Sequence, residues 1–297
     1  MSSPSIVARG ALGIRKEASF ASGGGLDNWQ VFESQGVEKS NNFVFQDRIR
    51  NSPEQIGGRF TSTQVAGGIT FPVSPQGPTQ WWECGIGGTG PYTPQLPLSS
   101  MAMEIQEGEV GSVYSSGDMI TRVELSSRKG DILRCSVNIE GKDMSSRTAT
   151  SIPSTAFPSG DDPFLHSEAT FTLEGVDSNK IESFSVVKEN NNITDLFANN
   201  TTRRDIPATK AVVSGSIQIL FEDTTHRNRF FNRLPSAFSI LYQRGARSFT
   251  IALNKLAINS SSRPMDSQTA FIMETLNFTA YVDNPSSENS MKITVVS

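Results

Sequence analysis

The stretch Val65-Ala-Gly67-Gly-Ile69-Thr-Phe71-Pro-Val73 places alternating apolar residues after a pair of glycines, which is the period-2 pattern of a half-buried β-strand. Val213-Ser-Gly215-Ser-Ile217-Gln-Ile219-Leu-Phe221 has the same form. Gly67 and Gly215 lie 148 residues apart, close to half of the 297-residue chain. Self-similarity at half the chain length predicts duplication of a whole domain, because solenoid repeats have much shorter periods.

The segments that follow these two strands also correspond. Each strand is followed by a short polar turn, an aromatic pair (Trp81-Trp82 and Phe230-Phe231) and a run of strand-like alternation. Residues 223–234 have helix signals, with a polar N-terminus and Pro235 as a stop. Further strands are expected at 101–105, 120–125, 133–139, 169–174, 181–186, 249–253, 271–278 and 292–295.

These patterns predict a mainly β protein built from two antiparallel β-sandwich or barrel domains, each with a flanking helix and a long loop. The Ser/Thr/Pro-rich stretch at 144–163 interrupts the alternation and is the best domain boundary. We therefore expect domains at 1–150 and 151–297, whose termini can intertwine. The long loops are the polar segments 40–60 and 188–206, and loops of this length are often functional.

Charge and composition exclude several classes of protein. The formal net charge is −4 and Lys and Arg do not cluster, so a protein that grips nucleic acid through phosphates is not indicated. No apolar run approaches the roughly 20 residues that a membrane helix requires. The first residues lack a secretory signal, which predicts folding in a cytoplasm. Cys84 and Cys135 are far apart in sequence and are expected to be free thiols in or near strands.

No residue pattern indicates an enzyme, a metal site or a cofactor. His166 and His226 have no sequence neighbours that complete a catalytic triad or a metal site. Asp161-Asp162 lies between Gly160 and Pro163 and fits a turn better than a cation site. Trp81-Trp82 fits a core better than a platform for stacking sugars.

Several segments together resemble the tail tube proteins of long-tailed, siphovirus-like bacteriophages, and the likeness covers most of the chain. They are Gly13-Ile-Arg-Lys-Glu17, the Arg-bearing loop leading into Gly67-Gly-Ile-Thr-Phe71, Trp81-Trp-Glu-Cys-Gly-Ile-Gly87, Val187-Lys-Glu-Asn-Asn191, Pro207-Ala and Val213-Ser-Gly215-Ser-Ile-Gln-Ile-Leu-Phe-Glu-Asp223.

The resemblance implies a virion protein, assembled in the host bacterial cytoplasm, that forms stacked rings around a hollow conduit for DNA ejection. Three duplicated chains would complete a pseudo-hexamer, and a hexamer of enlarged subunits is the alternative. The implied partners are further copies of the chain and the tape measure, tail terminator and tail-tip or baseplate proteins. DNA would pass without specific binding, and no membrane is involved.

On this interpretation two sets of charged residues are candidate functional residues. The loop cations expected to contact other subunits or rings are Arg48, Arg50, Arg59, Arg203 and Arg204. The inner wall is expected from strands at 120–139 and 249–282, and the candidates for negative charge facing the lumen are Glu124, Asp131 and Glu140 in the first half and Glu274 in the second. Two other functions stay open: a carbohydrate-binding β-sandwich that uses Trp81 and Trp82, and another phage part such as a decoration protein or tail adaptor.

Overall fold

The computed structural model describes residues 10–45, 57–108, 111–147, 162–174, 180–265 and 271–296, and the backbone of 176–177. The first half contains β1 (Ala11–Lys16), β2 (Asn28–Gln30), β3 (Ser34–Gln35), β4 (Glu38–Phe45), β5 (Gly58–Pro72), α1 (Gln80–Gly85), β6 (Met101–Gln106), β7 (Ser112–Arg128), β8 (Arg134–Gly141) and β9 (Asp143–Arg147). The second half contains β10 (Ala169–Leu173), β11 (Val176–Asp177), β12 (Ile181–Glu189), β13 (Val212–Leu220), α2 (Thr225–Phe231), β14 (Ser236–Arg244), β15 (Arg247–Ser262), β16 (Met273–Ala280) and β17 (Lys292–Val296). The mainly β class and every strand expected above are confirmed, as is the helix over 223–234.

Each half pairs its strands in the same pattern, and all the pairs are antiparallel. In the first half the pairs are β1–β2, β1–β6, β4–β5, β5–β8, β6–β7, β7–β8 and β7–β9, together with a two-residue β3–β5 pair that has no counterpart in the second half. In the second half they are β10–β11, β10–β14, β12–β13, β13–β16, β14–β15, β15–β16 and β15–β17. Strands β10 and β11 take the places of β1 and β2, and β12–β17 take the places of β4–β9 in the same order. With this replacement, every pair of the first half except β3–β5 becomes a pair of the second half.

The correspondence extends to irregularities of the sheets. The β7–β8 ladder shifts register between Ile120 and Arg122, and the β15–β16 ladder shifts between Ile258 and Ser260. A β-bulge inserts one unpaired residue and bends its strand, so a bulge at the same place re-aims the strand in the same way. The two halves thus share turning points as well as strand order.

The two glycines that open the repeated strands meet the same obstacle. A Cβ on Gly67 would lie 2.1 Å from the carbonyl oxygen of Gly36, and a Cβ on Gly215 would lie 2.2 Å from that of Ser185. Val186 lies opposite Gly215 in the β12–β13 ladder, so Ser185 and Gly36 each precede the residue facing the glycine. Only glycine permits this close approach of neighbouring strands.

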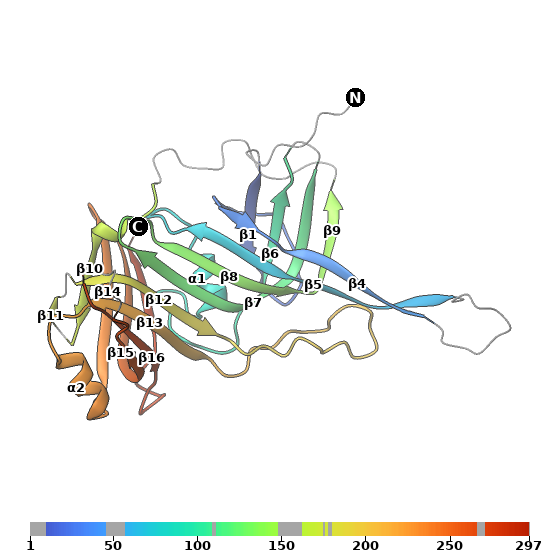
Figure 1. Cartoon of the computed structure of the whole chain (residues 1–297). Helices are drawn as coiled ribbons and strands as arrows, with labels where there is room; N and C mark the ends of the chain where they lie inside the picture. The colour runs from blue at the N-terminus through green and yellow to red at the C-terminus, as the bar shows by residue number, and fades with distance from the viewer. Residues whose placement is uncertain are drawn as a thin grey trace.

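One extended sheet joins the halves. Its strand order is β4, β5, β8, the C-terminal part of β7, β12, β13, β16 and the C-terminal part of β15. The seam is the antiparallel β7–β12 pair, in which Leu125 faces Val186. Figure 1 shows this sheet running across the molecule, with α2 at one end and the β4–β5 hairpin projecting beyond the other.

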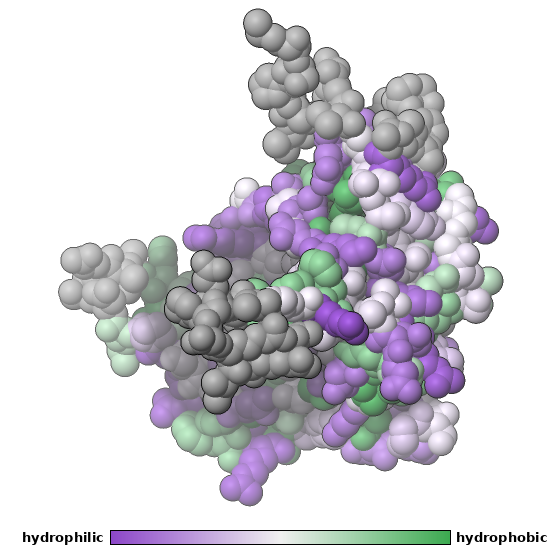
Figure 2. Space-filling view, turned by 90° about the vertical axis from the view of Figure 1, so that its right-hand side faces the viewer, coloured by the Kyte–Doolittle hydropathy of each residue, from purple (hydrophilic) through white to green (hydrophobic). Residues whose placement is uncertain are grey.

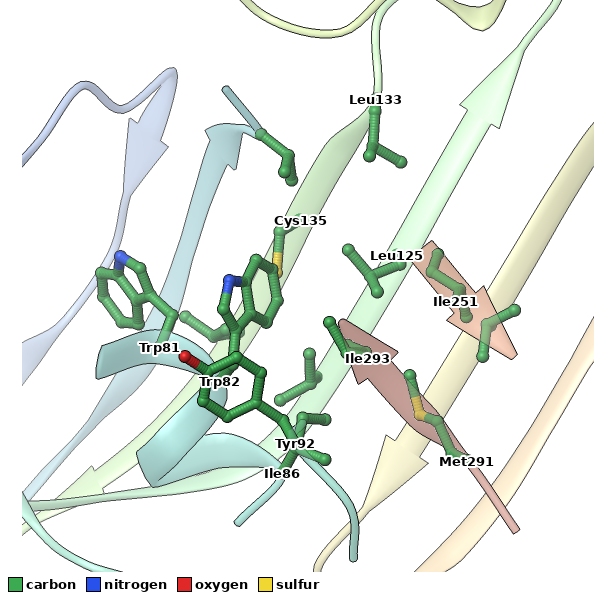
Figure 3. Close-up of a cluster of buried hydrophobic side chains, with 14 of the residues drawn as sticks. Trp81, Trp82, Ile86, Tyr92, Leu125, Leu133, Cys135, Ile251, Met291 and Ile293 are labelled. Atoms are coloured by element: carbon green, nitrogen blue, oxygen red, sulfur yellow. The ribbon is translucent and has the colours of Figure 1, made fainter. Parts of the chain in front are cut away.

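A single large hydrophobic core lies between the layers and takes residues from both halves. Trp82 packs against Phe249 with ring centroids 5.1 Å apart, and Tyr92 exchanges backbone hydrogen bonds of 2.8 Å with Ile293 on β17. Figure 3 shows Trp82 and Tyr92 on the side of α1 that faces Leu125 and Ile293, with Trp81 on the other side. Because the halves share this core, neither one contains all of its own packing partners.

Segment 40–60 is not the exposed loop that the sequence analysis predicted. Its described residues form the β4–β5 hairpin, with Val44 opposite Arg59, while residues 46–56 lie outside the described part. All eight residues of β4 are exposed, so neither face of this strand needs apolar side chains. The period-2 signal is therefore missing although the strand is present.

Candidate assembly surfaces

The contact between the two halves is an assembly surface that the structure displays within one chain. Besides the β7–β12 ladder, the buried ammonium group of Lys188 donates to the carbonyl oxygen of Gly85 at 2.9 Å. The side-chain amide of Asn190 donates to the carbonyl oxygens of Gly85 and Ile120, at 3.0 and 2.8 Å. A strand edge and two buried polar side chains from the second half thus hold α1 and β7 of the first.

The β12–β13 connection, residues 190–211, packs against the first half. Arg203 is 3 % exposed and pairs with Glu140 at 2.6 Å. Its guanidinium group also donates to the carbonyl oxygens of Val65, Gly141 and Thr194, at 3.1, 3.0 and 2.7 Å. This arginine covers the end of β8 and the middle of β5, where the ladder between those strands stops.

The same connection inserts apolar side chains into the first half. Ile206 is fully buried and forms a small cluster with Leu98 and Met119, against which Phe20 and Ala208 pack. Part of the connection keeps the geometry of a hairpin, because the amide of Ile193 donates to the carbonyl oxygen of Pro207 at 2.9 Å. The predicted long loop 188–206 therefore starts with the last two residues of β12 and continues into this connection. We call the connection, residues 190–211, the docked arm, because it packs against the first half of its own chain.

The predicted loop cations have different environments. Arg203 uses its guanidinium donors inside the chain, in the ion pair with Glu140 and in the hydrogen bonds given above. Its contact with another subunit stays a prediction, which these internal partners do not favour. Arg59, on the projecting hairpin, and Arg204, beside Arg203, are exposed. Arg48 and Arg50 lie outside the described residues, and the roles of these four arginines stay predictions.

The four predicted lumen acids also have different environments in the structure. Glu274 is fully buried, accepts a hydrogen bond of 2.6 Å from the Ser261 hydroxyl and lies 3.5 Å from Arg263. This burial does not favour a lumen-facing charge, and the lumen role of Glu274 stays a prediction. Glu140 is bound to Arg203. Asp131 lies in the β7–β8 turn, where a 2.6 Å hydrogen bond from Arg134 lowers its pKa.

Glu124 remains on the face of the extended sheet opposite the core. Its neighbours Val123 and Leu125 are buried, and side chains alternate between faces along a strand. The carboxylate bonds to Arg122 at 2.9 Å and accepts a hydrogen bond of 2.9 Å from the Ser185 hydroxyl across the seam. Arg122 is also 3.3 Å from Glu189.

The rest of this polar face carries mainly hydroxyl and amide groups. They hydrogen-bond between neighbouring strands as Thr70 with Ser136, Ser183 with Gln218, and Asn277 with Ser260. Arg134, at its border, is neutralised by Asp131 and by Glu33 at 2.8 Å. The face is thus polar with charges that compensate locally, which leaves few free cations for phosphate groups.

Two strand edges end the extended sheet, and no described strand pairs with either of them. One is the outer edge of β4, whose ladder partner is β5. The other is the C-terminal part of β15 beyond its pairing with β14, Ala257–Ser262, which pairs with β16 on one side. Unpaired edges template the addition of another chain.

Buried ionisable groups outside the predicted sets escaped the sequence analysis. Burial raises the pKa of Asp118 to about 8, and the Ser115 hydroxyl donates to its carboxyl group. Burial lowers the pKa of Lys188 to about 7. Both groups interrupt alternating strands at inward positions, but a single polar residue in such a pattern does not reveal a buried charge.

The remaining sequence candidates have structural roles. Trp81 and Trp82 are 1 % and 4 % exposed, which removes the surface platform that sugar stacking would require. Cys84 and Cys135 are free thiols, as expected, and both are buried; Cys135 lies in β8, whereas Cys84 lies in helix α1 and not in a strand. Burial raises the pKa of Cys84 to about 12. His166 is buried; its ring bonds the Ser127 hydroxyl and the carbonyl oxygen of Ile181. Within the described ranges, no helix is long and apolar enough to span a bilayer.

Comparison with known families places these features in context. No curated protein matches the sequence significantly. A family model described as phage tail tube protein matches residues 7–280, which is most of the chain and includes both halves. A mostly β subunit with open sheet edges and a neutral polar face agrees with a structural component of the virion. The chain belongs to the phage tail tube protein family.

Proposed function

We propose that this chain assembles into rings that stack to form the hollow tail tube through which DNA leaves the phage. The observation that supports the proposal most strongly is the pair of open edges. β4 corresponds to β12, and β15 corresponds to β7, so the open edges are the counterparts of the two strands that join at the seam. The β7–β12 ladder inside one chain therefore predicts a β15–β4 ladder between successive chains.

The internal ladder also supports a particular register for the proposed ladder between chains. Leu125 faces Val186 and Val123 faces Lys188 at the seam. The corresponding residues are Arg263 with Val37 and Ser261 with Lys39 of the next chain. Repeating one head-to-tail contact closes a ring when the rotation fits, and alternate seams and ladders would join the sheets into one barrel.

Two repeats in each chain favour a ring of three chains. A ring of three chains then has three seams within chains and three ladders between chains. These six contacts are nearly equivalent, so the ring is a pseudo-hexamer with two domains per subunit. The polar face of the extended sheet is the proposed lumen wall. Its locally neutralised charges suit a conduit, because a strongly basic wall would hold DNA phosphates and retard passage. Tape measure, terminator and tail-tip proteins are the partners expected at the tube and its ends.

Negative-stain electron microscopy of the purified chain over a concentration series tests assembly. Rings or tubes are expected, and native mass spectrometry of rings should give the mass of three chains. A mass of six chains would replace the trimer by a hexamer of enlarged subunits. A monomer at every concentration would count against assembly by the open edges.

A further inference from the structure

The β4–β5 hairpin ends in an exposed aromatic cluster. The exposed fractions of Phe43, Phe45 and Phe60 are 41 %, 51 % and 69 %. The ring of Phe43 packs edge-on against both others, with centroid distances of 4.9 Å. Three clustered phenylalanines on a projecting hairpin leave apolar surface in water, which is the signature of an interaction site. Figure 2 views the molecule from the side toward which the hairpin projects.

A groove of about 520 Å³ lies at α2, in the second half. Its apolar wall consists of Phe230, Phe231, Leu234, Pro235, Ala257, Ile258 and Tyr281. No residue of α2 is buried, and Phe231 is 62 % exposed, so this helix is incompletely covered. The hairpin of the same chain does not fill the groove, because the two lie at opposite ends of the molecule (Figure 1).

The contact between the halves identifies what fits the groove. Docked arm 190–211 corresponds to the projecting hairpin, since the Ile193–Pro207 hydrogen bond occupies the place of the Val44–Arg59 pair. Ala208 then corresponds to Phe60. Ala208 packs in the first half beside Met119, within the cluster that Ile206 fills.

The receiving positions correspond as well. Ile120 and Ile258 precede the same bulge, so Met119 corresponds to Ala257, which lines the groove. The first half combines a large receiving residue, Met119, with a small incoming one, Ala208. The second half has the small receiving residue, Ala257, and the hairpin carries the large one, Phe60. A large side chain would thus meet a small one in both contacts, so the contact of Phe60 with Ala257 would be filled about as well as that of Ala208 with Met119.

We propose that the aromatic end of the hairpin, with Phe60 leading, docks in the α2 groove of a second copy of this chain. The contact continues the β15–β4 ladder, so the inference rests on the proposed function and adds the residues that fasten the joint. Asn41 corresponds to Asn190 and would bond the carbonyl oxygen of Ile258 as Asn190 bonds that of Ile120. The α2 groove is then part of the interface between subunits and is unfilled only in the isolated chain.

Cysteine cross-linking tests the placement. Phe60→Cys and Ala257→Cys chains are mixed as monomers, concentrated under oxidising conditions and separated on a non-reducing gel. A disulfide-linked dimer is expected for this mixture. A mixture of Phe60→Cys with Val296→Cys is the control, because Val296 is exposed but lies outside the groove. Native Cys84 and Cys135 are buried and do not compete.

Volume exchange provides a second test that does not require a cross-link. Phe60→Ala should raise the concentration required for ring formation about tenfold or more without changing thermal unfolding of the monomer, because the side chain is exposed before assembly. Adding Ala257→Met to Phe60→Ala reproduces the Met119–Ala208 pair of the first half. The double variant should therefore form rings at a lower concentration than Phe60→Ala alone. Rings without the specific cross-link, together with normal assembly of Phe60→Ala, would overturn the docking and leave the tube proposal standing. If the unmodified chain forms no rings, both proposals fail.

Discussion

The two halves carry equivalent hairpins in opposite situations. The arm at 190–211 lies against its own first half, where Arg203 and Ile206 are buried. The β4–β5 hairpin extends into solvent, with all of β4 exposed. The same element therefore makes an interface inside the chain and leaves its counterpart open outside it. On the proposed assembly, a subunit with two such halves contains one complete joint and the two separated parts of another.

The docked arm should depend most strongly on Arg203. Arg203→Ala removes a buried cation from Glu140 and leaves the carbonyl oxygens of Val65 and Gly141 without their donor. We expect the free energy of unfolding to fall by about 3 kcal/mol, since breaking a buried pair leaves an uncompensated group. Urea unfolding measures the change.

Arg204→Ala is the matched control, because Arg204 is the next residue and is exposed. Its effect should stay within about 0.5 kcal/mol. Equal losses in both variants would mean that general charge, and not the internal joint, determines stability. The comparison of docked and projecting hairpins would then lose its energetic basis.

The repeated glycines test whether the halves are equivalent in packing. Gly67→Ala and Gly215→Ala each force a Cβ against the backbone of the neighbouring strand, at 2.1 and 2.2 Å. Each should lower the free energy of unfolding by about 2 kcal/mol, because overpacking of this kind shifts backbone. Thermal unfolding of both variants checks this.

Gly25→Ala is the control for the glycine pair, since a Cβ there meets nothing within 4 Å. A large loss in one repeat and none in the other would show that the strands correspond in order but not in close packing.

Much of the β architecture could be predicted from sequence because buried faces leave a visible alternation. β5 and β13 carry that alternation together with the repeated glycine, and β8 shows it around Cys135. β4 could not be found in this way, since a strand exposed on both faces lacks an apolar period. The burial of Arg203 and Glu274 was equally hidden, because sequence gives the charge of a side chain but not the distant partners that satisfy it.

Buried Asp118 gives the first half an ionisable group at a position where the second half has none. The position corresponding to Asp118 in the second half is Leu256, since Met101 faces Asp118 as Ser236 faces Leu256. The pKa of Asp118 is raised to about 8 in the folded chain. The folded state then holds a proton that the unfolded state releases near its ordinary pKa, so stability falls as pH rises from about 4 to about 8.

Asp118→Asn should remove this dependence, which is at most about 1.4 kcal/mol per pH unit. Urea unfolding at pH 5 and pH 8 measures it, and exposed Asp195→Asn is the control. Retention of the full slope in Asp118→Asn would assign the pH dependence to other groups.

The smallest effect on stability is expected at Glu124, on the polar face at the seam. Glu124→Lys breaks the exposed pair with Arg122, so unfolding should change by about 0.5 kcal/mol or less. In an assembled tube the same change would place a repeated cation beside passing phosphates and slow DNA release by a few-fold, on the order expected for added phosphate contacts. Time-resolved release from phage built with the variant measures this, and Glu124→Gln separates loss of the acid from gain of the cation. Glu274→Lys cannot serve in place of Glu124→Lys as a probe of the lumen, because Glu274 is buried and a lysine there would unfold the subunit. Unchanged release in Glu124→Lys would place the polar face away from the lumen and would require the sheet to curve the other way.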